Sequence, residues 1–271
     1  MSSLSHPQPH VTPASLVGVA APPLPLATRL RIVIRLFAIQ ASWNYEVLMG
    51  SGIGFCVEPA LRLLPGGQGG EAYRAALARQ SQYFNAHPYL AAIAVGALAR
   101  AELEGQPPAR IERFRTALCG PLGSVGDRLV WVGLLPTASW FALVLFGLGV
   151  GAPGCVLAFL LLFNVAHVAL RLWGLERGWR AGLGVAQSLA HPLLREGPTR
   201  LARLGTFLSG VAVPLVIARL VGDSLAASAI AVAVALGGAG VLVYLHGRVE
   251  GWRIALVVAV AALAFLLVRH A

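Results

Sequence analysis

Apolar residues are gathered into long blocks along this chain instead of alternating with polar ones. Five blocks are each close to the length of a membrane-crossing helix, at 129–150, 154–173, 206–222, 224–245 and 254–268. A helix needs about 20 apolar residues to cross roughly 30 Å of hydrocarbon. We therefore predict four to five spanning helices.

The first half of the chain carries shorter apolar runs, which cannot span a bilayer. Residues 49–57 and 90–99 are such runs, and the glycine-rich stretch 65–70 separates the first from a helix predicted over 71–82. The predicted fold class is thus an all-α membrane protein, a polytopic helical bundle with short re-entrant or interfacial segments in its N-terminal half.

The domain organisation follows from the remaining segments. Residues 1–28 are rich in proline, alanine and serine and are predicted to be a disordered cytoplasmic tail, with one membrane domain over 29–271. The charged segment 100–116 is predicted to be a cytoplasmic connector. The glycines and proline of 119–127 predict an opened backbone at the membrane edge. Small residues at a spacing of four predict a helix-contact face at Ala227, Ala231, Ala235 and Ala239.

Composition supports the membrane interpretation. The chain is 57% hydrophobic and 12% charged, whereas soluble domains carry about 25% charged residues. The net charge of +10 comes from arginine alone, since the sequence contains no lysine. The arginines cluster between apolar blocks, as at 110–115 and 171–203, which is the pattern of cytoplasmic loops in a multi-pass membrane protein. This placement argues against nucleic acid as a partner.

Motifs for independent chemistry are absent from the sequence. It has no phosphate-binding loop ending in Lys-Ser/Thr, no paired-histidine zinc motif and no Gly-x-Ser-x-Gly nucleophile. Cys56, Cys119 and Cys155 lie in apolar surroundings without a nearby histidine at metal-ligand spacing. We expect reduced thiols, no metal, no cofactor and no catalytic residue.

Polar side chains interrupt the second spanning block. Asn164, His167 and Arg171 are three and four residues apart and therefore share one helix face. Polar groups at membrane depth usually face a bundle interior or a water-filled path, which makes Asn164 and His167 candidate ligand-binding residues. Alternatively, the two only bond a neighbouring helix while Arg171 extends to the headgroups.

Asp127 is one of just two aspartates in the chain and follows a glycine-rich turn. It can accept hydroxyl protons from a sugar, or it can cap a helix beginning near Leu129. Both interpretations remain open on the sequence.

Two further polar groups lie in the N-terminal half. Trp43, Asn44 and Glu46 combine an aromatic ring with amide and carboxylate groups, which suits carbohydrate binding, although Trp43 is equally suited to an interfacial anchor. Asn85 and His87 precede Pro88 and are either ligand-binding residues or turn formers.

Four blocks carry a resemblance to a known family. Ser42-Trp-Asn-Tyr-Glu46, Tyr83-Phe-Asn-Ala-His-Pro88, the 119–127 block Cys-Gly-Pro-Leu-Gly-Ser-Val-Gly-Asp, and Leu162-Phe-Asn-Val-Ala-His167 occur in that order. Together they resemble the IID component of the mannose/fructose/sorbose family of phosphoenolpyruvate-dependent sugar phosphotransferase systems. The likeness is strongest over residues 40–182.

The resemblance implies a permease half in the bacterial inner membrane that binds and translocates a hexose together with a IIC subunit. Soluble IIA and IIB subunits would carry the phosphoryl group, and IIC–IID pairs would form a higher oligomer. On this interpretation the chain is not an enzyme by itself. The sugar would be held by Trp43, Asn44, Glu46, Asn85, His87, Asp127, Asn164 and His167.

The sequence departs from the family pattern in two places. Val47 stands where an arginine usually follows Trp-Asn-Tyr-Glu, and residues 183–271 match poorly. These departures motivate a second hypothesis, a non-transporting regulatory or assembly subunit that docks phosphotransferase partners through the basic segment 174–205.

Overall fold

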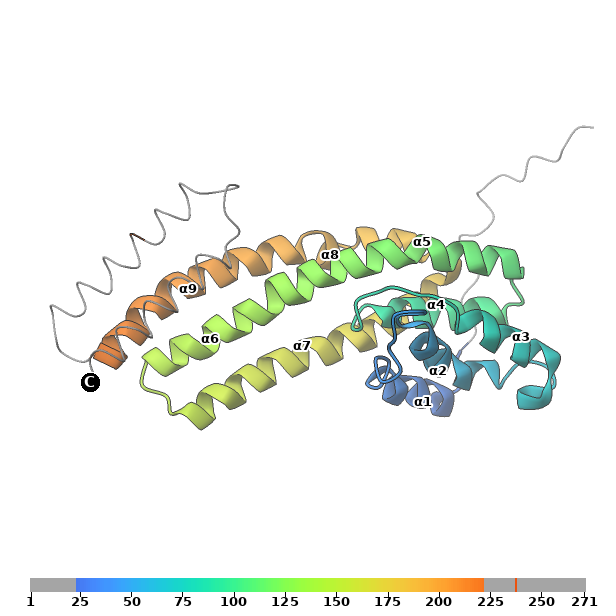
Figure 1. The fold of residues 1–271 in the computed structure, drawn as a ribbon, viewed down its shortest axis with the longest axis horizontal. Helices are drawn as coiled ribbons and strands as arrows, with labels where there is room; N and C mark the ends of the chain where they lie inside the picture. The colour runs from blue at the N-terminus through green and yellow to red at the C-terminus, as the bar shows by residue number, and fades with distance from the viewer. Residues whose placement is uncertain (1–22, 222–236, 238–271) are drawn as a thin grey trace, which may run out of the picture. The chain divides into compact units, whose positions relative to one another are not determined.

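The computed structural model describes residues 23–221 and Gly237, and within them the chain forms helices and turns with two isolated β-bridges (Figure 1). It divides into two compact units. Unit 1 comprises the residues up to 138 together with 159–205, and unit 2 comprises 139–158 with the residues from 206 onward. The predicted all-α fold is confirmed.

Short helices form the N-terminal part of unit 1. The two apolar runs that are too short to span become the second and fourth helices, and the glycine-rich stretch, predicted to be a break, contains a single 3-10 turn. The first helix begins inside the segment predicted as a tail. These elements are α1 (Leu26–Leu36), α2 (Gly50–Leu61), η2 (Gly67–Gly69), α3 (Glu71–Gln80) and α4 (Ala91–Leu103).

Long helices follow. Three segments, Pro108–Gly147, Ala152–Val185 and Gly197–Leu220, are long and apolar enough to cross a membrane. They confirm three of the five predicted spans, and the blocks 224–245 and 254–268 lie outside the described residues. The elements are α5 (Pro108–Asp127), the π-helical turn η3 (Arg128–Leu134), α6 (Leu135–Gly147), α7 (Ala152–Ala181), η4 (Gly182–Ala190), α8 (Pro192–Arg195) and α9 (Gly197–Val221).

The region before the first span is more helical than the sequence predicts. The segment 100–116, predicted to be a cytoplasmic connector, contains the end of α4 at Leu103 and the start of α5 at Pro108, where proline suits the first helical position. The prediction of an opened backbone over 119–127 is wrong, because these residues stay helical around Pro121. Tertiary packing outweighs local propensity here, because the glycines of this stretch bring the helix close to a neighbouring loop.

The core of unit 1 is built around α4. Residues 91–102 are all buried, and α2 packs against α1, α3 and α4. A methyl group on Gly96 would lie 2.3 Å from the carbonyl oxygen of Leu175, and one on Gly178 would lie 2.0 Å from that of Ile93. These glycines therefore let α4 and α7 touch backbone to backbone, the packing that small residues allow between membrane helices.

Unit 2 contains the ends of the long helices. A methyl group on Gly147 would meet the Leu215 side chain at 2.5 Å, so α6 and α9 also approach closely. The Arg219 guanidinium stacks on the Phe146 ring and donates to the Phe146 and Val150 carbonyl oxygens. The predicted small-residue row from Ala227 to Ala239 lies outside the described residues.

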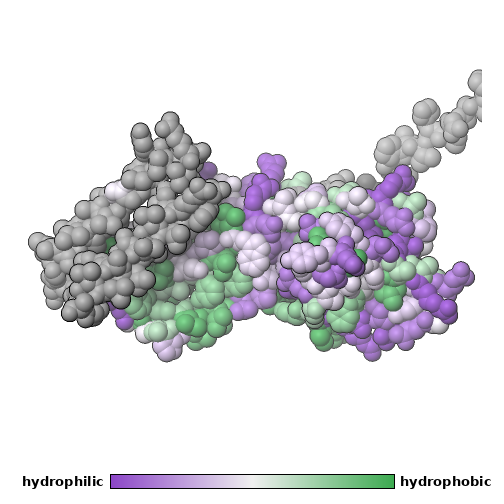
Figure 2. All heavy atoms as spheres, viewed as in Figure 1, coloured by the Kyte–Doolittle hydropathy of each residue, from purple (hydrophilic) through white to green (hydrophobic). Residues whose placement is uncertain are grey.

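The short helices and the long helices differ in the hydropathy of their exposed surfaces. In Figure 2 the surface over α1–α3 carries many hydrophilic residues, whereas the surface over α6 and the start of α7 is mainly hydrophobic. Val156, Leu157, Leu160 and Leu161 of α7 are each 47–57% exposed. Such an exposed aliphatic surface suits a bilayer.

Candidate functional site

The first two sequence blocks lie beside each other. The Asn44 side chain accepts hydrogen bonds from the backbone N–H groups of Glu46 and Val47, both at 3.0 Å, and so folds the loop before α2. The Phe84 N–H then donates to the Val47 carbonyl at 3.2 Å, and the Met49 N–H donates to the Phe84 carbonyl at 3.0 Å. Asn44 therefore acts as a turn former that positions the first block on the second.

The second block rests on the third. The His87 backbone N–H donates to the Leu122 carbonyl of α5 at 3.3 Å. A methyl group on Gly126 would lie 2.1 Å from the Cβ atom of His87, and one on Gly123 would lie 3.8 Å from the Asn85 amide nitrogen. Glycine at these positions is what lets the His87 loop lie against α5.

The fourth block joins through aromatic contacts. The Tyr89 ring lies 5.0 Å from the His87 ring and 4.7 Å from the His167 ring, centroid to centroid. Trp131, on the π-helical turn η3, lies 5.3 Å from His87, and the Arg171 guanidinium lies 4.8 Å from the Tyr89 ring centre. We call His87, Tyr89, Trp131, His167 and Arg171 the histidine cluster.

Three buried polar atoms of the histidine cluster have no hydrogen-bond partner among the described residues: His87 Nε2, His167 Nδ1 and Arg171 Nε. Burying a polar atom without a partner is costly, and more than nine in ten buried backbone groups and most buried side-chain polar atoms are paired. Arg171 does hold a structural contact, because another of its nitrogens donates to the Leu36 carbonyl. The unpaired atoms mark a place where a polar ligand group would be stabilised.

His87 is neutral at physiological pH. Burial, assisted by the positive charge of Arg171, lowers the pKa of His87 to about 4. Its Nδ1 atom accepts a hydrogen bond from the Tyr89 N–H at 3.2 Å, so the ring proton lies on Nε2. His87 therefore presents an unpaired N–H donor inside the cluster.

The remaining predicted site residues are exposed. Trp43 packs edge to face on Tyr45, with ring centres 4.8 Å apart, and Glu46 and Asn85 lie on exposed parts of their loops. Asn164 donates to the Leu160 carbonyl one turn earlier, at 2.6 Å. Asp127 is exposed and makes no capping hydrogen bond, because the helix continues through it. The structure thus brings the buried His87 and the half-buried His167 into one cluster and leaves the other six outside it.

Two cluster residues, Tyr89 and Trp131, carried no sequence signal strong enough to select them. Tyr89 follows His87 by two residues, which looks like ordinary loop sequence. Trp131 lies four residues after Asp127, but the π-helical turn changes the direction of its side chain, which residue spacing does not reveal. Arg171 was detectable through its spacing of four from His167.

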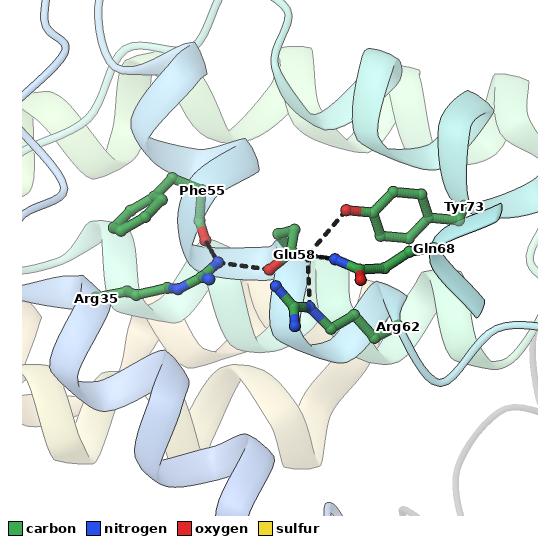
Figure 3. Close-up of polar contacts among 6 residues, drawn as sticks. All are labelled: Arg35, Phe55, Glu58, Arg62, Gln68 and Tyr73. Atoms are coloured by element: carbon green, nitrogen blue, oxygen red, sulfur yellow. Dashed lines mark hydrogen bonds and ion pairs between the residues drawn. The ribbon is translucent and has the colours of Figure 1, made fainter.

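A second buried polar group in unit 1 is fully paired (Figure 3). Glu58 of α2 accepts from Arg35 and Arg62 at 2.7 Å, from Tyr73 at 2.8 Å and from Gln68 at 3.3 Å. Burial raises the pKa of Glu58, but the hydrogen bonds from Arg62, Tyr73 and Arg35 outweigh it and lower the pKa to about 2. We call this set the Glu58 network. It ties α1, η2 and α3 to α2.

Arg115 holds α5 against the second block. This buried side chain donates to the Gln80 side-chain oxygen at 2.6 Å and to the Gln82 carbonyl at 2.8 Å. Gln80 in turn donates to Glu102 at 2.6 Å. Gln80 and Gln82, at the two ends of the turn before Tyr83, are therefore both held by side-chain hydrogen bonds. These bonds position the chain that leads to His87.

Comparison with known proteins identifies the family of the chain. The family described as "PTS system mannose/fructose/sorbose family IID component" matches residues 24–222. The mannose-specific EIID component of Escherichia coli K12 is 29% identical over 206 residues, which cover 70% of each chain. The sorbose-specific EIID component of Klebsiella pneumoniae is 34% identical over 182 residues, 64% of each chain.

Solved structures show the same fold. A complex of the mannose transporter ManYZ with microcin E492 contains a chain with a TM-score of 0.54 at 23% identity, covering 89% of this chain and 96% of that one. A second structure, described only as a membrane protein, has a TM-score of 0.67 at 24% identity with the same coverage. The predicted location, the bacterial inner membrane with several crossings, agrees with the family and with the three membrane-length helices. This chain belongs to the mannose/fructose/sorbose family of IID components of sugar phosphotransferase systems.

Proposed function

We propose that this chain binds a hexose and moves it across the membrane together with a IIC subunit. The sugar is then presented to a IIB subunit for phosphorylation. The observation that carries the proposal is the histidine cluster, where three sequence blocks of the family meet around buried polar atoms without partners. The description of one structural relative as a mannose transporter is consistent with it.

The chemistry of the cluster suits a sugar. Hexose hydroxyls both donate and accept hydrogen bonds, and pockets usually hold such ligands with a few polar groups among apolar walls. His87 offers an N–H donor, Arg171 offers another at Nε, and His167 offers an unpaired ring nitrogen. The faces of Tyr89 and Trp131 supply apolar surface for the sugar ring.

The predicted site residues outside the histidine cluster have a different role in this proposal. Trp43, Glu46, Asn85, Asp127 and Asn164 are exposed in the single chain. The proposal therefore has the sugar path continue from the cluster toward a surface shared with IIC. No residue of this chain is phosphorylated, because the IIA and IIB subunits carry the phosphoryl group.

Exchanging the two histidines for amides tests the cluster, with uptake and phosphorylation of labelled mannose or fructose measured in cells that supply IIA, IIB and IIC. The glutamine amide nitrogen occupies roughly the place of Nε2 in histidine, and asparagine Oδ1 that of Nδ1. Because the unpaired atom is Nε2 in His87 and Nδ1 in His167, His87→Gln and His167→Asn should keep most uptake. His87→Asn and His167→Gln should lose about tenfold, since one hydrogen bond is worth about 1.4 kcal/mol.

If the two histidines had a purely structural role, the tolerated amide would not change from glutamine at position 87 to asparagine at position 167. Equal uptake in all four variants overturns the cluster as a sugar site. Asp127→Asn and Asn164→Ala test the exposed members in the same cells, and wild-type rates in both would remove these two from the sugar path. Assembly with IIB without any hexose uptake by the wild-type chain would favour the regulatory hypothesis over transport.

A further inference from the structure

Unit 1 contains a cavity, about 420 Å³ in volume and partly open, whose lining includes no residue of the histidine cluster. This volume falls within the roughly 300–1,000 Å³ of ordinary ligand pockets. Each of the three membrane-length helices contributes to its wall. The lining includes Leu129, Leu134, Ala169, Trp173, Leu193 and Leu201.

The lining excludes a sugar. All residues around the cavity are apolar, and almost all of its surface comes from carbon atoms. A hexose placed there would lose its hydrogen bonds to water without replacement, which costs several kcal/mol per polar group. Water molecules would likewise find few hydrogen-bond partners on this lining.

The surroundings identify an occupant. The cavity is partly open and is lined by three membrane-length helices. The apolar ligand that a bilayer supplies to such a cavity at highest concentration is the acyl chain of a phospholipid. Exposed arginines adjoin the lining residues along the chain: Arg128 precedes Leu129, Arg195 follows Leu193 by two residues, and Arg200 precedes Leu201. Arg200 also pairs with Glu196 at 2.6 Å, an exposed contact that a phosphate group can replace. Arginines that neighbour the lining of a cavity between membrane-length helices suit an anionic headgroup.

We propose that this cavity binds one acyl chain of an anionic phospholipid, with the phosphate held by arginines of α8 and α9. Trp173 forms part of the cavity wall, and its ring packs against the His191 ring, with ring centres 5.2 Å apart. The His191 side chain caps α8 by accepting from the Leu193 N–H at 3.2 Å. The lipid would thereby hold α7, α8 and the start of α9 together, independently of sugar binding.

Filling the cavity is the first test. The full chain is purified in detergent, dioleoyl-phosphatidylglycerol or dioleoyl-phosphatidylcholine is titrated in, and bound lipids are counted by native mass spectrometry. Ala169→Phe should weaken the first bound phosphatidylglycerol at least tenfold, because the ring occupies the cavity. Leu172→Phe is the matched control, since Leu172 is exposed on the same helix and does not line the cavity. Equal binding by the two variants overturns the site.

Removing the charges is the second test. The double variant Arg195→Gln/Arg200→Gln should bind the two lipids equally, whereas the unchanged protein should prefer phosphatidylglycerol at least tenfold. Arg110→Gln/Arg113→Gln, on α5 away from the cavity lining, is the control and should keep the preference. A preference that survives in the first double variant overturns the proposed headgroup contact. Loss of the preference in both overturns it too, because that result reflects net charge alone.

Discussion

The Glu58 network and the histidine cluster are two buried polar regions of the same unit, and they differ in how completely their atoms are paired. Both carboxylate oxygens of Glu58 accept hydrogen bonds, from four side chains in all. The histidine cluster leaves three buried nitrogen atoms without partners among the described residues. A fully paired polar group stabilises the fold, whereas an unpaired buried group is stabilised when a ligand supplies its hydrogen-bond partner. The first region should therefore control stability and the second transport.

The largest expected effect is on stability, from removing the centre of the Glu58 network. Glu58→Leu leaves Tyr73 without this acceptor and removes one of the two acceptors of Arg35. It should lower the free energy of unfolding by about 3 kcal/mol, measured by chemical unfolding in mixed micelles. Glu196→Leu is the control, because Glu196 forms only an exposed pair with Arg200 and should cost under about 1 kcal/mol. Hexose uptake per folded molecule should stay within about twofold, and a larger loss would contradict the division of roles.

Acid should weaken the same network. The folded-state pKa of Glu58 is about 2 and lies below the ordinary value of 4.5, so the unfolded chain binds a proton first as the pH falls. The stabilisation is complete above about pH 4.5 and is lost as the pH falls toward 2. Glu58→Gln should remove this part of the pH dependence, measured by unfolding between pH 6 and 3. An unchanged pH profile in the variant would show that other carboxylates are responsible.

Within the histidine cluster, Arg171→Lys should reduce uptake per folded molecule about tenfold, or about 1.4 kcal/mol. Lysine keeps the positive charge but lacks the Nε atom and the flat guanidinium that lies against Tyr89. Arg177→Lys, at an exposed position of the same helix, should leave uptake as it is. If both variants transport at the wild-type rate, the positive charge alone accounts for the contribution of Arg171 to uptake.

The smallest effect concerns the packing of α5 against the His87 loop. Gly126→Ala places a methyl group 2.1 Å from the Cβ atom of His87 and should destabilise the fold by about 1 kcal/mol and slow uptake. Gly120→Ala, in open space on the same helix, should instead stabilise it slightly, because alanine favours helix more than glycine does. Similar behaviour of the two variants would contradict the contact between α5 and the His87 loop.

Some of this organisation was predictable from the sequence. Long apolar blocks gave the three described spans, and the Asn164, His167 and Arg171 spacing indicated a polar helix face. Asn164 nevertheless turned out to be exposed, with its amide nitrogen bonded to its own helix. Residue spacing defines a face about 100° wide but does not say which edge of it meets a neighbour.

Other parts could not be predicted because they depend on distant contacts. The glycines of 119–127 suggested a broken helix. The close approach of Gly126 to His87 could not be predicted, because it is a contact between segments that are distant in the sequence. Tyr89 and Trp131 became cluster residues only when α5, α7 and the loop before α4 came together. The Glu58 network combines residues from four elements and left no local pattern.

The π-helical turn η3 carries one more consequence. A π turn holds about one residue more than an α turn, so the helix beyond it is rotated by about 100° relative to an uninterrupted helix. The side chain of Trp131 therefore reaches His87 from a position that an uninterrupted helix would turn elsewhere. Deleting one residue between 128 and 134 would remove this extra rotation and turn Trp131 away from His87.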